Sequence, residues 1–320
     1  MGFFDEKPIC FDIRQNFIKF IYGSRENSNI VVEKYGYVNL EDRHLEDGLI
    51  NLNDETVKIM KNIMPKNNIQ TNIAKVNLWH SAVSLRIVKI PYMPEADLEL
   101  FMDAEIKRLL PQGLEDSVYD YKILEELDDG EKQFYSLMIT SFPKKIKERL
   151  LNFFQRINLK LTALDVYPNT VGRVYSFNKK ENVAIADING NNLDFLIVNN
   201  GKIFMYSNIL LDDFAGVGTK GDTEKINFLK DEMVLYEIMK PINSFISSYL
   251  NYFSSRRSGK QLDKMYLLGG ISELENMDIH LTNRFGIVVE RGLPSNIKVP
   301  PEADMRHYVG ALGLLLRDDE

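Results

Sequence analysis

The sequence predicts an α/β protein with two lobes, and the clearest sign is a pair of similar segments about 175 residues apart. Residues 9–20 and residues 183–195 each read as an apolar strand ending in an aspartate, then a polar turn and a second apolar strand. These aspartates are Asp12 and Asp187. A third segment, residues 265–272, is an apolar strand that leads into a pair of glycines. Helical patterns separate the strand segments, which is typical of the α/β class.

The length and composition favour a globular protein of two domains. The chain has 320 residues, of which 44% are hydrophobic, so it can fill more than one core. It carries 39 basic and 46 acidic residues. The net charge of −7 argues against nucleic acid as the main partner, because binding to nucleic acid draws its affinity from clustered Lys and Arg.

The sequence also predicts a cytoplasmic protein. Its single cysteine, Cys10, lies in an apolar strand, so no disulfide can form within the chain, which suits a reducing compartment. No apolar run approaches the roughly 20 residues that span a membrane. Residues 1–6 lack the basic flank and the long apolar core of a signal peptide. We therefore expect the chain to reach a membrane only through a partner.

In the first lobe, residues 9–22 and 29–38 alternate between apolar and polar positions and are expected to form consecutive strands. A helix is expected from residue 52 to Pro65, where proline ends the pattern. Residues 73–78 read as the next strand.

Residues 81–161 read as an inserted unit with its own alternation of strands and helices. The expected order is a strand at 83–91, a helix at 94–110, strands at 120–125 and 133–140, a helix at 142–157, and a returning strand at 159–166. We expect these elements to form one compact sheet with both helices on the same face.

The second half begins near residue 181 with hairpins that run to about residue 208. Two helices are expected at 223–239 and 242–255, separated by Pro241, because proline disrupts a helix interior. A closing helix is expected at 303–316.

The paired hairpins indicate a phosphate site. Each one directs its turn amides and its carboxylate to one point, and two facing hairpins can hold a phosphate chain and its magnesium ion from both sides. The paired glycines allow the backbone to approach a flat ligand closely. This order of segments resembles the actin/hexokinase/Hsp70 superfamily, whose actin-like, ribonuclease-H-like fold has two lobes. The resemblance implies ATP and Mg as cofactors.

A narrower resemblance comes from the inserted unit and the end of the chain. Its segments are Ser84–Pro91, Pro94–Leu98, Glu105–Pro111, Tyr121–Leu124 and Tyr308–Arg317. In this order they resemble the type IV pilus assembly protein PilM family, which shares an inserted 1C subdomain with FtsA. FtsA also carries a C-terminal amphipathic helix that targets membranes, whereas this chain ends in an acidic stretch at 317–320, which an anionic membrane repels.

The resemblance implies four subdomains. They are 1A at 1–80, 162–180 and 303–320, 1C at 81–161, 2A at 181–215 and 258–302, and 2B at 216–257.

The resemblance also implies the residues that contact a nucleotide. They are Asp12, Arg14, Gln15, Asn16 and Lys19 on the first hairpin, Asp187, Asn189, Gly190 and Asn191 on the second, and Gly269, Gly270, Ile271 and Gly310. Asp12 and Asp187 are the expected magnesium ligands. The first turn departs from the family, because it reads Arg-Gln-Asn where the family has glycine and small hydroxyl residues. Arg14 either supplies charge to a phosphate or fills the space, and Asn189 replaces a glycine of the second turn.

The function implied is that of a scaffold in the inner-membrane platform of the type IV pilus, with degenerate ATP binding. It would bind the cytoplasmic N-terminal peptide of a PilN-like membrane protein, in a groove between the first subdomain and the inserted one. The candidate groove residues are on the faces of the inserted unit, near 83–90 and 133–140. A pilus assembly ATPase is a further candidate partner, and the oligomeric state is open. The alternatives are an active ATPase or kinase, which the altered first turn argues against, and an FtsA-like filament, which the acidic end argues against.

Overall fold

The computed structural model describes residues 7–14, 17–26, 29–40, 52–79, 82–109, 116–128, 130–177, 181–189, 192–211, 232–257, 261–294, 297–300 and 303–317. The chain divides into two compact units. Unit 1 comprises residues 1–171, 296–303 and 308–320, and unit 2 comprises residues 172–295 and 304–307.

Unit 1 is built on a six-stranded sheet with the strand order β14-β3-β2-β1-β4-β8. The strands are β1 (Ile9–Ile13), β2 (Phe17–Glu26), β3 (Asn29–Asn39), β4 (Ile73–Leu78), β8 (Lys160–Val166) and β14 (Ile297–Lys298). β1 pairs antiparallel with β2 and parallel with β4, so the first predicted hairpin lies at the centre of the sheet.

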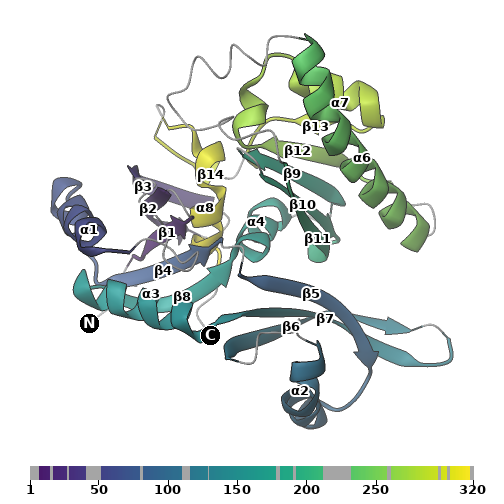
Figure 1. The fold of residues 1–320 in the computed structure, drawn as a ribbon, viewed down its shortest axis with the longest axis horizontal. Coiled ribbons are helices and arrows are strands. Elements are labelled where there is room, and N and C mark those ends of the chain that lie inside the picture. Colours follow the sequence, from purple (N-terminus) through teal and green to yellow (C-terminus); the bar gives the residue numbers. More distant parts are fainter. Residues whose placement is uncertain are drawn as a thin grey trace. The chain divides into compact units, whose positions relative to one another are not determined.

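Alternate residues of β1 serve the two faces of this sheet. Phe11 and its neighbours at i±2 pack into the core formed with α1 (Asp54–Lys66) and α3 (Lys144–Arg156). The opposite face holds Asp12 and is covered by α8 (Val309–Leu315), every residue of which is buried (Figure 1). The closing helix is shorter than expected, because the 3₁₀ helix η3 (Met305–Tyr308) precedes α8.

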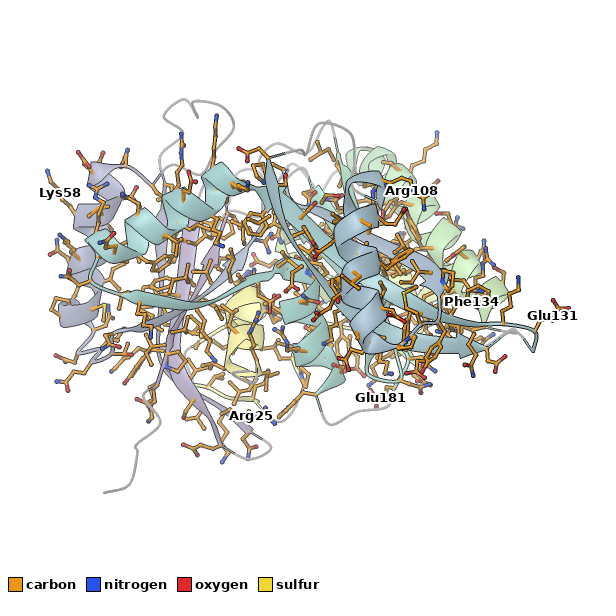
Figure 2. The ribbon with its side chains drawn as sticks, turned by 90° about the horizontal axis from the view of Figure 1, so that it is seen from below. Arg25, Lys58, Arg108, Glu131, Phe134 and Glu181 are labelled. Carbon is orange, nitrogen blue, oxygen red and sulfur yellow. The ribbon has the colours of Figure 1, made fainter. Side chains whose placement is uncertain are left out.

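A separate three-stranded antiparallel sheet has the order β5-β7-β6. Its strands are β5 (Ser84–Pro91), β6 (Ser117–Asp128) and β7 (Gln133–Pro143). Helix α2 (Glu95–Leu109) lies across one face and buries Leu98 and Met102 against Leu137 (Figure 2, where Arg108 marks α2). In the chain, the elements of this small sheet lie between β4 and β8.

The expectation that both helices of the insertion lie on the small sheet is wrong. The apolar stripe of α3 packs into the core of the six-stranded sheet, where the Phe154 ring lies 5.4 Å from that of Phe11. The returning strand β8 pairs with β4 in the same large sheet. The physical reason is that parallel neighbours such as β4 and β8 require a crossover, and the helix of a crossover covers the face of their sheet. The four-subdomain division itself stays a prediction.

Unit 2 is built on a five-stranded sheet with the order β11-β10-β9-β12-β13. The strands are β9 (Val183–Asn189), β10 (Asn192–Asn199), β11 (Lys202–Leu210), β12 (Lys264–Leu268) and β13 (Val289–Glu290). The helices are α4 (Tyr167–Ser176), which begins in unit 1, α6 (Glu232–Arg256) and α7 (Met277–Phe285), with the 3₁₀ helix η2 (Gly270–Glu273) after β12. The second predicted hairpin is β9–β10.

Helix α6 runs without a break through Pro241, so the expected division into two helices is wrong. Ile242, Ile246 and Phe253 are at most 1% exposed and pack into the core of unit 2. Burial of this stripe outweighs the cost of a proline inside a helix, which is about 3 kcal/mol. Residues 223–231 lie outside the described residues. Within the described part of the chain, no helix is both long and apolar enough to cross a membrane.

Candidate functional site

Asp12 lies at the end of β1, where it is 1% exposed and pairs across the hairpin with Lys19. The Asn77 side-chain amide donates a hydrogen bond of 2.7 Å to Asp12 Oδ1. Thr170 Oγ1 in turn donates to Asn77 Oδ1 at 3.1 Å, which fixes the orientation of that amide. The carboxylate of Asp12 is therefore held rigidly by groups from β4 and α4.

Gly310 is needed where α8 approaches this carboxylate. A Cβ atom at residue 310 would lie 2.8 Å from Asp12 Oδ2 and 2.6 Å from Asn77 Nδ2. Real Cβ atoms essentially never come this close, so any other residue here requires either the helix or the side chains of Asp12 and Asn77 to move. The predicted site residue Gly310 thus lies next to Asp12, as a packing contact.

Arg14 lies directly after β1 and is 8% exposed. Its Nε atom is 3.6 Å from Asp12 Oδ2. Three aromatic rings surround its guanidinium, with their centroids at 4.5 Å for Tyr167, 5.7 Å for Phe17 and 5.8 Å for Trp79. The Arg14 backbone N–H donates to Phe17 O at 3.0 Å. Both the side chain and the turn amide of Arg14 are therefore engaged within the hairpin.

Lys19 completes the described part of this first cluster. Its Nζ atom lies 4.4 Å from the centroid of Phe17 and 5.9 Å from that of Tyr308. Arg14 and Lys19 thus share the ring of Phe17. The other two predicted residues of the turn, Gln15 and Asn16, lie outside the described residues.

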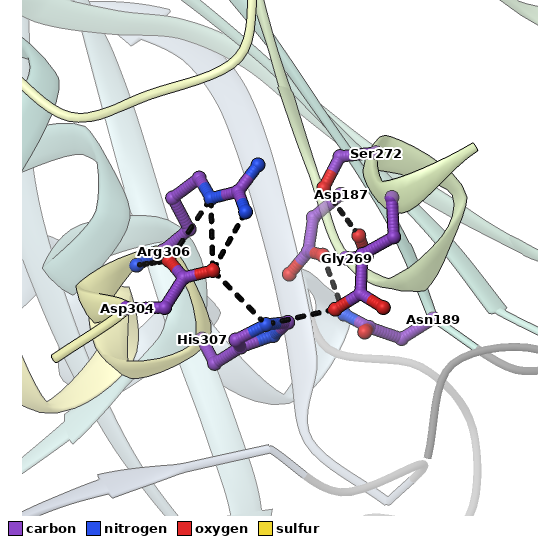
Figure 3. A network of polar contacts seen from close by, with 8 residues as sticks. Asp187, Asn189, Gly269, Ser272, Asp304, Arg306 and His307 are labelled. Carbon is purple, nitrogen blue, oxygen red and sulfur yellow. Dashed lines mark hydrogen bonds and ion pairs between the residues drawn. The ribbon is translucent and has the colours of Figure 1, made fainter. Parts of the chain in front are cut away.

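Asp187 is the counterpart of Asp12 on the second hairpin and is 4% exposed at the end of β9. The Asn189 side-chain amide donates a hydrogen bond to it (Figure 3). The residue opposite Asp187 on β10 is a second buried carboxylate, Asp194. Asp194 accepts hydrogen bonds from Asn192 Nδ2 at 2.7 Å and from the Tyr206 hydroxyl at 2.5 Å.

The sequence reasoning missed Asp194, although a signal for it exists. Residues that face each other across an antiparallel pair share one face of the sheet. Counting back from the turn of the predicted hairpin pairs Asp194 with Asp187, so the sequence pattern could have predicted this second carboxylate. The predicted residues Gly190 and Asn191 of the second turn lie outside the described residues.

The paired glycines of the third segment do approach the second hairpin closely. Gly269 has φ +78°, and a Cβ atom there would lie 2.2 Å from Ile188 O and 2.7 Å from Asp187 Oδ1. Its carbonyl accepts hydrogen bonds from the N–H and Oγ of Ser272, at 3.0 and 2.6 Å. Gly270 and Ile271 begin the 3₁₀ helix η2 and are buried. The structure therefore brings Asp187, Asn189 and the Gly269 turn together.

A further polar network of unit 2 was not predicted from the sequence. Asp304 Oδ2 lies 2.6 Å from the Arg306 guanidinium, and the hydrogen bonds from Arg306 hold the pKa of this carboxyl below its ordinary value. His307 Nε2 lies 3.0 Å from Glu273 Oε1 in η2 (Figure 3).

Complete burial raises the pKa of Tyr175 well above its ordinary value, and the nearby Asp187 charge adds to this effect.

The two hairpins are therefore chemically different. The carboxylate of the first lies beside two basic side chains, Arg14 and Lys19. The carboxylate of the second lies opposite another acid and is bonded by an amide. Carboxylate and amide oxygens are groups that bind Mg²⁺. However, the described residues contain no group of three or more His, Cys, Asp or Glu side chains arranged to hold a metal ion.

Comparisons with known proteins place this geometry in context. The family model described as "Type IV pilus assembly protein PilM" matches residues 10–209. A solved structure described as "PilM-PilN type IV pilus biogenesis complex" is 19% identical, with a TM-score of 0.75 and 98% of each chain covered. A comparison with curated protein sequences gave no match.

More distant solved structures include the ethanolamine utilization protein EutJ from Carboxydothermus hydrogenoformans, at 14% identity, a TM-score of 0.48, and 97% of this chain and 89% of that chain covered. The cytoplasmic domain of EpsL from the type II secretion system of Vibrio cholerae is 10% identical, with a TM-score of 0.47 and coverage of 98% and 96%. The match to the pilus complex chain confirms the actin-like α/β fold that the sequence predicts.

Proposed function

This chain belongs to the type IV pilus assembly protein PilM family, and we propose that it is a cytoplasmic scaffold that binds the N-terminal peptide of a PilN-like membrane protein. The partner named in the similar solved complex supports this choice. In this role the chain is held at the inner face of the membrane through its partner. An edge strand on the small sheet supports this proposal most directly.

That edge strand is β5. Among the described strands, only β7 pairs with it, so β5 is an edge strand of this sheet. An extended peptide recognises such an edge by main-chain hydrogen bonds, and pockets for alternate side chains provide specificity. The residues of β5 overlap the stretch 83–90, which is expected to contribute to the peptide groove.

The face of β5 turned away from α2 carries two apolar side chains, Leu85 and Ile87, followed by the exposed Lys89. Leu85 and Ile87 are half-buried there and lie opposite Thr140 and Met138 of β7. Helix α2 covers the other face, against residues such as Ile90 and Leu137. An extended apolar peptide can therefore pair with the edge of β5 and place alternate side chains on the face formed by Leu85 and Ile87.

The test is a titration of the full chain with a peptide of the partner's cytoplasmic N-terminus, followed by calorimetry. We expect Ile87→Asp to weaken binding at least tenfold, because it puts a charge on the face formed by Leu85 and Ile87; a tenfold loss corresponds to about 1.4 kcal/mol. The matched control is Leu100→Asp on the outer side of α2, where Leu100 is 71% exposed. Unchanged binding by Ile87→Asp, or an equal loss with Leu100→Asp, contradicts this site.

The actin-like fold also implies a binding site for ATP and its magnesium ion. The residues of the first hairpin do not fit this ligand. Asp12, the expected magnesium ligand, lies beside the buried Arg14 guanidinium, and the Arg14 turn amide is bonded within the hairpin. A phosphate-binding turn instead presents free backbone amides to its ligand. This mismatch supports a scaffold with degenerate ATP binding over an active ATPase or kinase.

A further inference from the structure

We propose that Arg14 is a built-in occupant of the first hairpin, whose guanidinium lies where a nucleotide-bound cation would meet Asp12 and so closes this half of the site to magnesium and phosphate. The inference deepens the nucleotide part of the proposed function. It does not depend on peptide binding.

Arg14 already compensates the charge of Asp12. A buried carboxylate is costly unless it is paired, and Asp12 is 1% exposed. Its Oδ1 accepts a hydrogen bond from Asn77, and its Oδ2 lies at ion-pair distance from Arg14. A magnesium ion brought to the same carboxylate meets the fixed positive charge of Arg14, and like charges repel strongly in a poorly solvated site. Arg14 thus already supplies the compensation that the cation of a nucleotide would provide.

The Arg14 side chain also fills the space beside Asp12 and is held there by aromatic rings. The guanidinium is flanked by Tyr167, Phe17 and Trp79, with ring centroids 4.5 to 5.8 Å away. Arginine stacks favourably on aromatic faces, and such contacts strengthen as the cation is desolvated. A side chain that is 8% exposed and stacked in this way is fixed in place. It occupies volume next to Asp12 that a glycine at the same position would leave open.

The position of Arg14 does not suit the alternative role of a phosphate ligand. A phosphate-binding arginine directs its N–H donors to the phosphate oxygens, often as a bidentate pair. The Arg14 guanidinium is instead buried and directed to an internal carboxylate. Lys19, opposite Asp12, lies over Phe17 and Tyr308 and adds a second positive charge that further disfavours a cation here.

The experiment compares the full-length wild type with Arg14→Gly by calorimetry and by thermal shift, with magnesium alone and with magnesium-ATP as probes. We expect Arg14→Gly to bind magnesium-ATP at least tenfold more tightly than the wild type. We also expect magnesium alone to raise the Tm of Arg14→Gly and to leave that of the wild type unchanged. Equal or weaker binding of magnesium-ATP by Arg14→Gly overturns the proposal, and weaker binding identifies Arg14 as a phosphate ligand.

Two further variants keep the result decisive. Arg14→Lys retains the charge and is expected to behave like the wild type; magnesium-ATP binding as tight as that of Arg14→Gly overturns the charge argument. Arg14→Gln retains much of the side-chain volume, supports the rings if Arg14→Gly does not fold, and is expected to bind magnesium more tightly than the wild type. Affinity for the partner peptide, measured in parallel, is expected to be the same in all variants. A wild type that fails to bind the peptide contradicts the scaffold and leaves the Arg14 comparison standing.

Discussion

Asp12 and Asp187 end equivalent strands, yet their immediate neighbours give them different chemistry. Lys19 lies opposite Asp12 and Arg14 lies beside it, whereas Asp194 lies opposite Asp187. At the scale of single residues, a basic neighbour compensates a buried carboxylate, and an acidic neighbour requires hydrogen-bond donors instead. Those donors are the Asn189 amide for Asp187 and Asn192 and Tyr206 for Asp194.

Gly269 is the residue with the strictest requirement in unit 2. Its backbone angles are φ +78° and ψ −176°, a region that is essentially reserved for glycine. The carbonyl of Ile188 also lies where a Cβ atom would be. Both conditions follow from the close approach of the turn after β12 to the second hairpin.

We therefore expect Gly269→Ala to destabilise unit 2 strongly. The backbone conformation alone costs about 1–3 kcal/mol for a residue with a side chain, and the overlap with Ile188 adds to this. The control is Gly286→Ala at the end of α7, where φ is +68° but no atom lies within 4 Å of the added Cβ. Thermal unfolding checks both variants, and a Tm for Gly269→Ala equal to that of Gly286→Ala contradicts the role of close packing.

At the scale of elements, α3 shows that an insertion in sequence need not be one body in space. Its stripe of Ile146, Leu150, Phe153 and Phe154 belongs to the core of the six-stranded sheet. Helix α2, from the same insertion, packs on the small sheet instead. The two helices therefore stabilise different sheets.

Adjacent leucines of α3 provide a matched pair for testing this packing. Leu150 is fully buried, so Leu150→Ala is expected to destabilise unit 1 by about 2–5 kcal/mol, through lost burial and the cavity that remains. Leu151 is 46% exposed, and Leu151→Ala is expected to change stability by less than about 1 kcal/mol. Urea denaturation monitored by circular dichroism measures the difference. Similar losses in both variants contradict the assignment of α3 to this core.

At the scale of the whole molecule, the chain passes between the two units more than once. Residues 172–295 form most of unit 2, and residues 304–307 return to it between two segments of unit 1. Unit 1 therefore obtains β14 and α8 from the C-terminal end, where α8 covers the face that bears Asp12. The fold of unit 1 therefore depends on segments from about the last 25 residues of the chain.

A truncation tests this dependence. A chain ending at residue 303 lacks α8 and exposes the face of β1 that bears Asp12, so we expect it to lose the cooperative thermal unfolding of unit 1 and to be cleaved rapidly by protease. A chain ending at Arg317 keeps α8 and the contacts of Arg317 with Leu164 O and Asp165, and is expected to unfold like the full chain. Cooperative unfolding of unit 1 in the chain that ends at 303 contradicts the dependence.

Local pattern in the sequence was enough for the class of fold, the positions of both hairpins and the glycine turn, because strand alternation, turn residues and paired glycines are read over a few neighbouring positions. The family resemblance supplied the pilus assignment, which the match over residues 10–209 confirms. Only the tertiary structure decided that α3 leaves the small sheet and that α6 continues through Pro241. It also decided that Arg14 turns inward to Asp12, between the ring of its neighbour Phe17 and the rings of Trp79 and Tyr167 from distant segments. Each of these depends on which surfaces meet after folding, and neither residue spacing nor local propensity encodes those contacts.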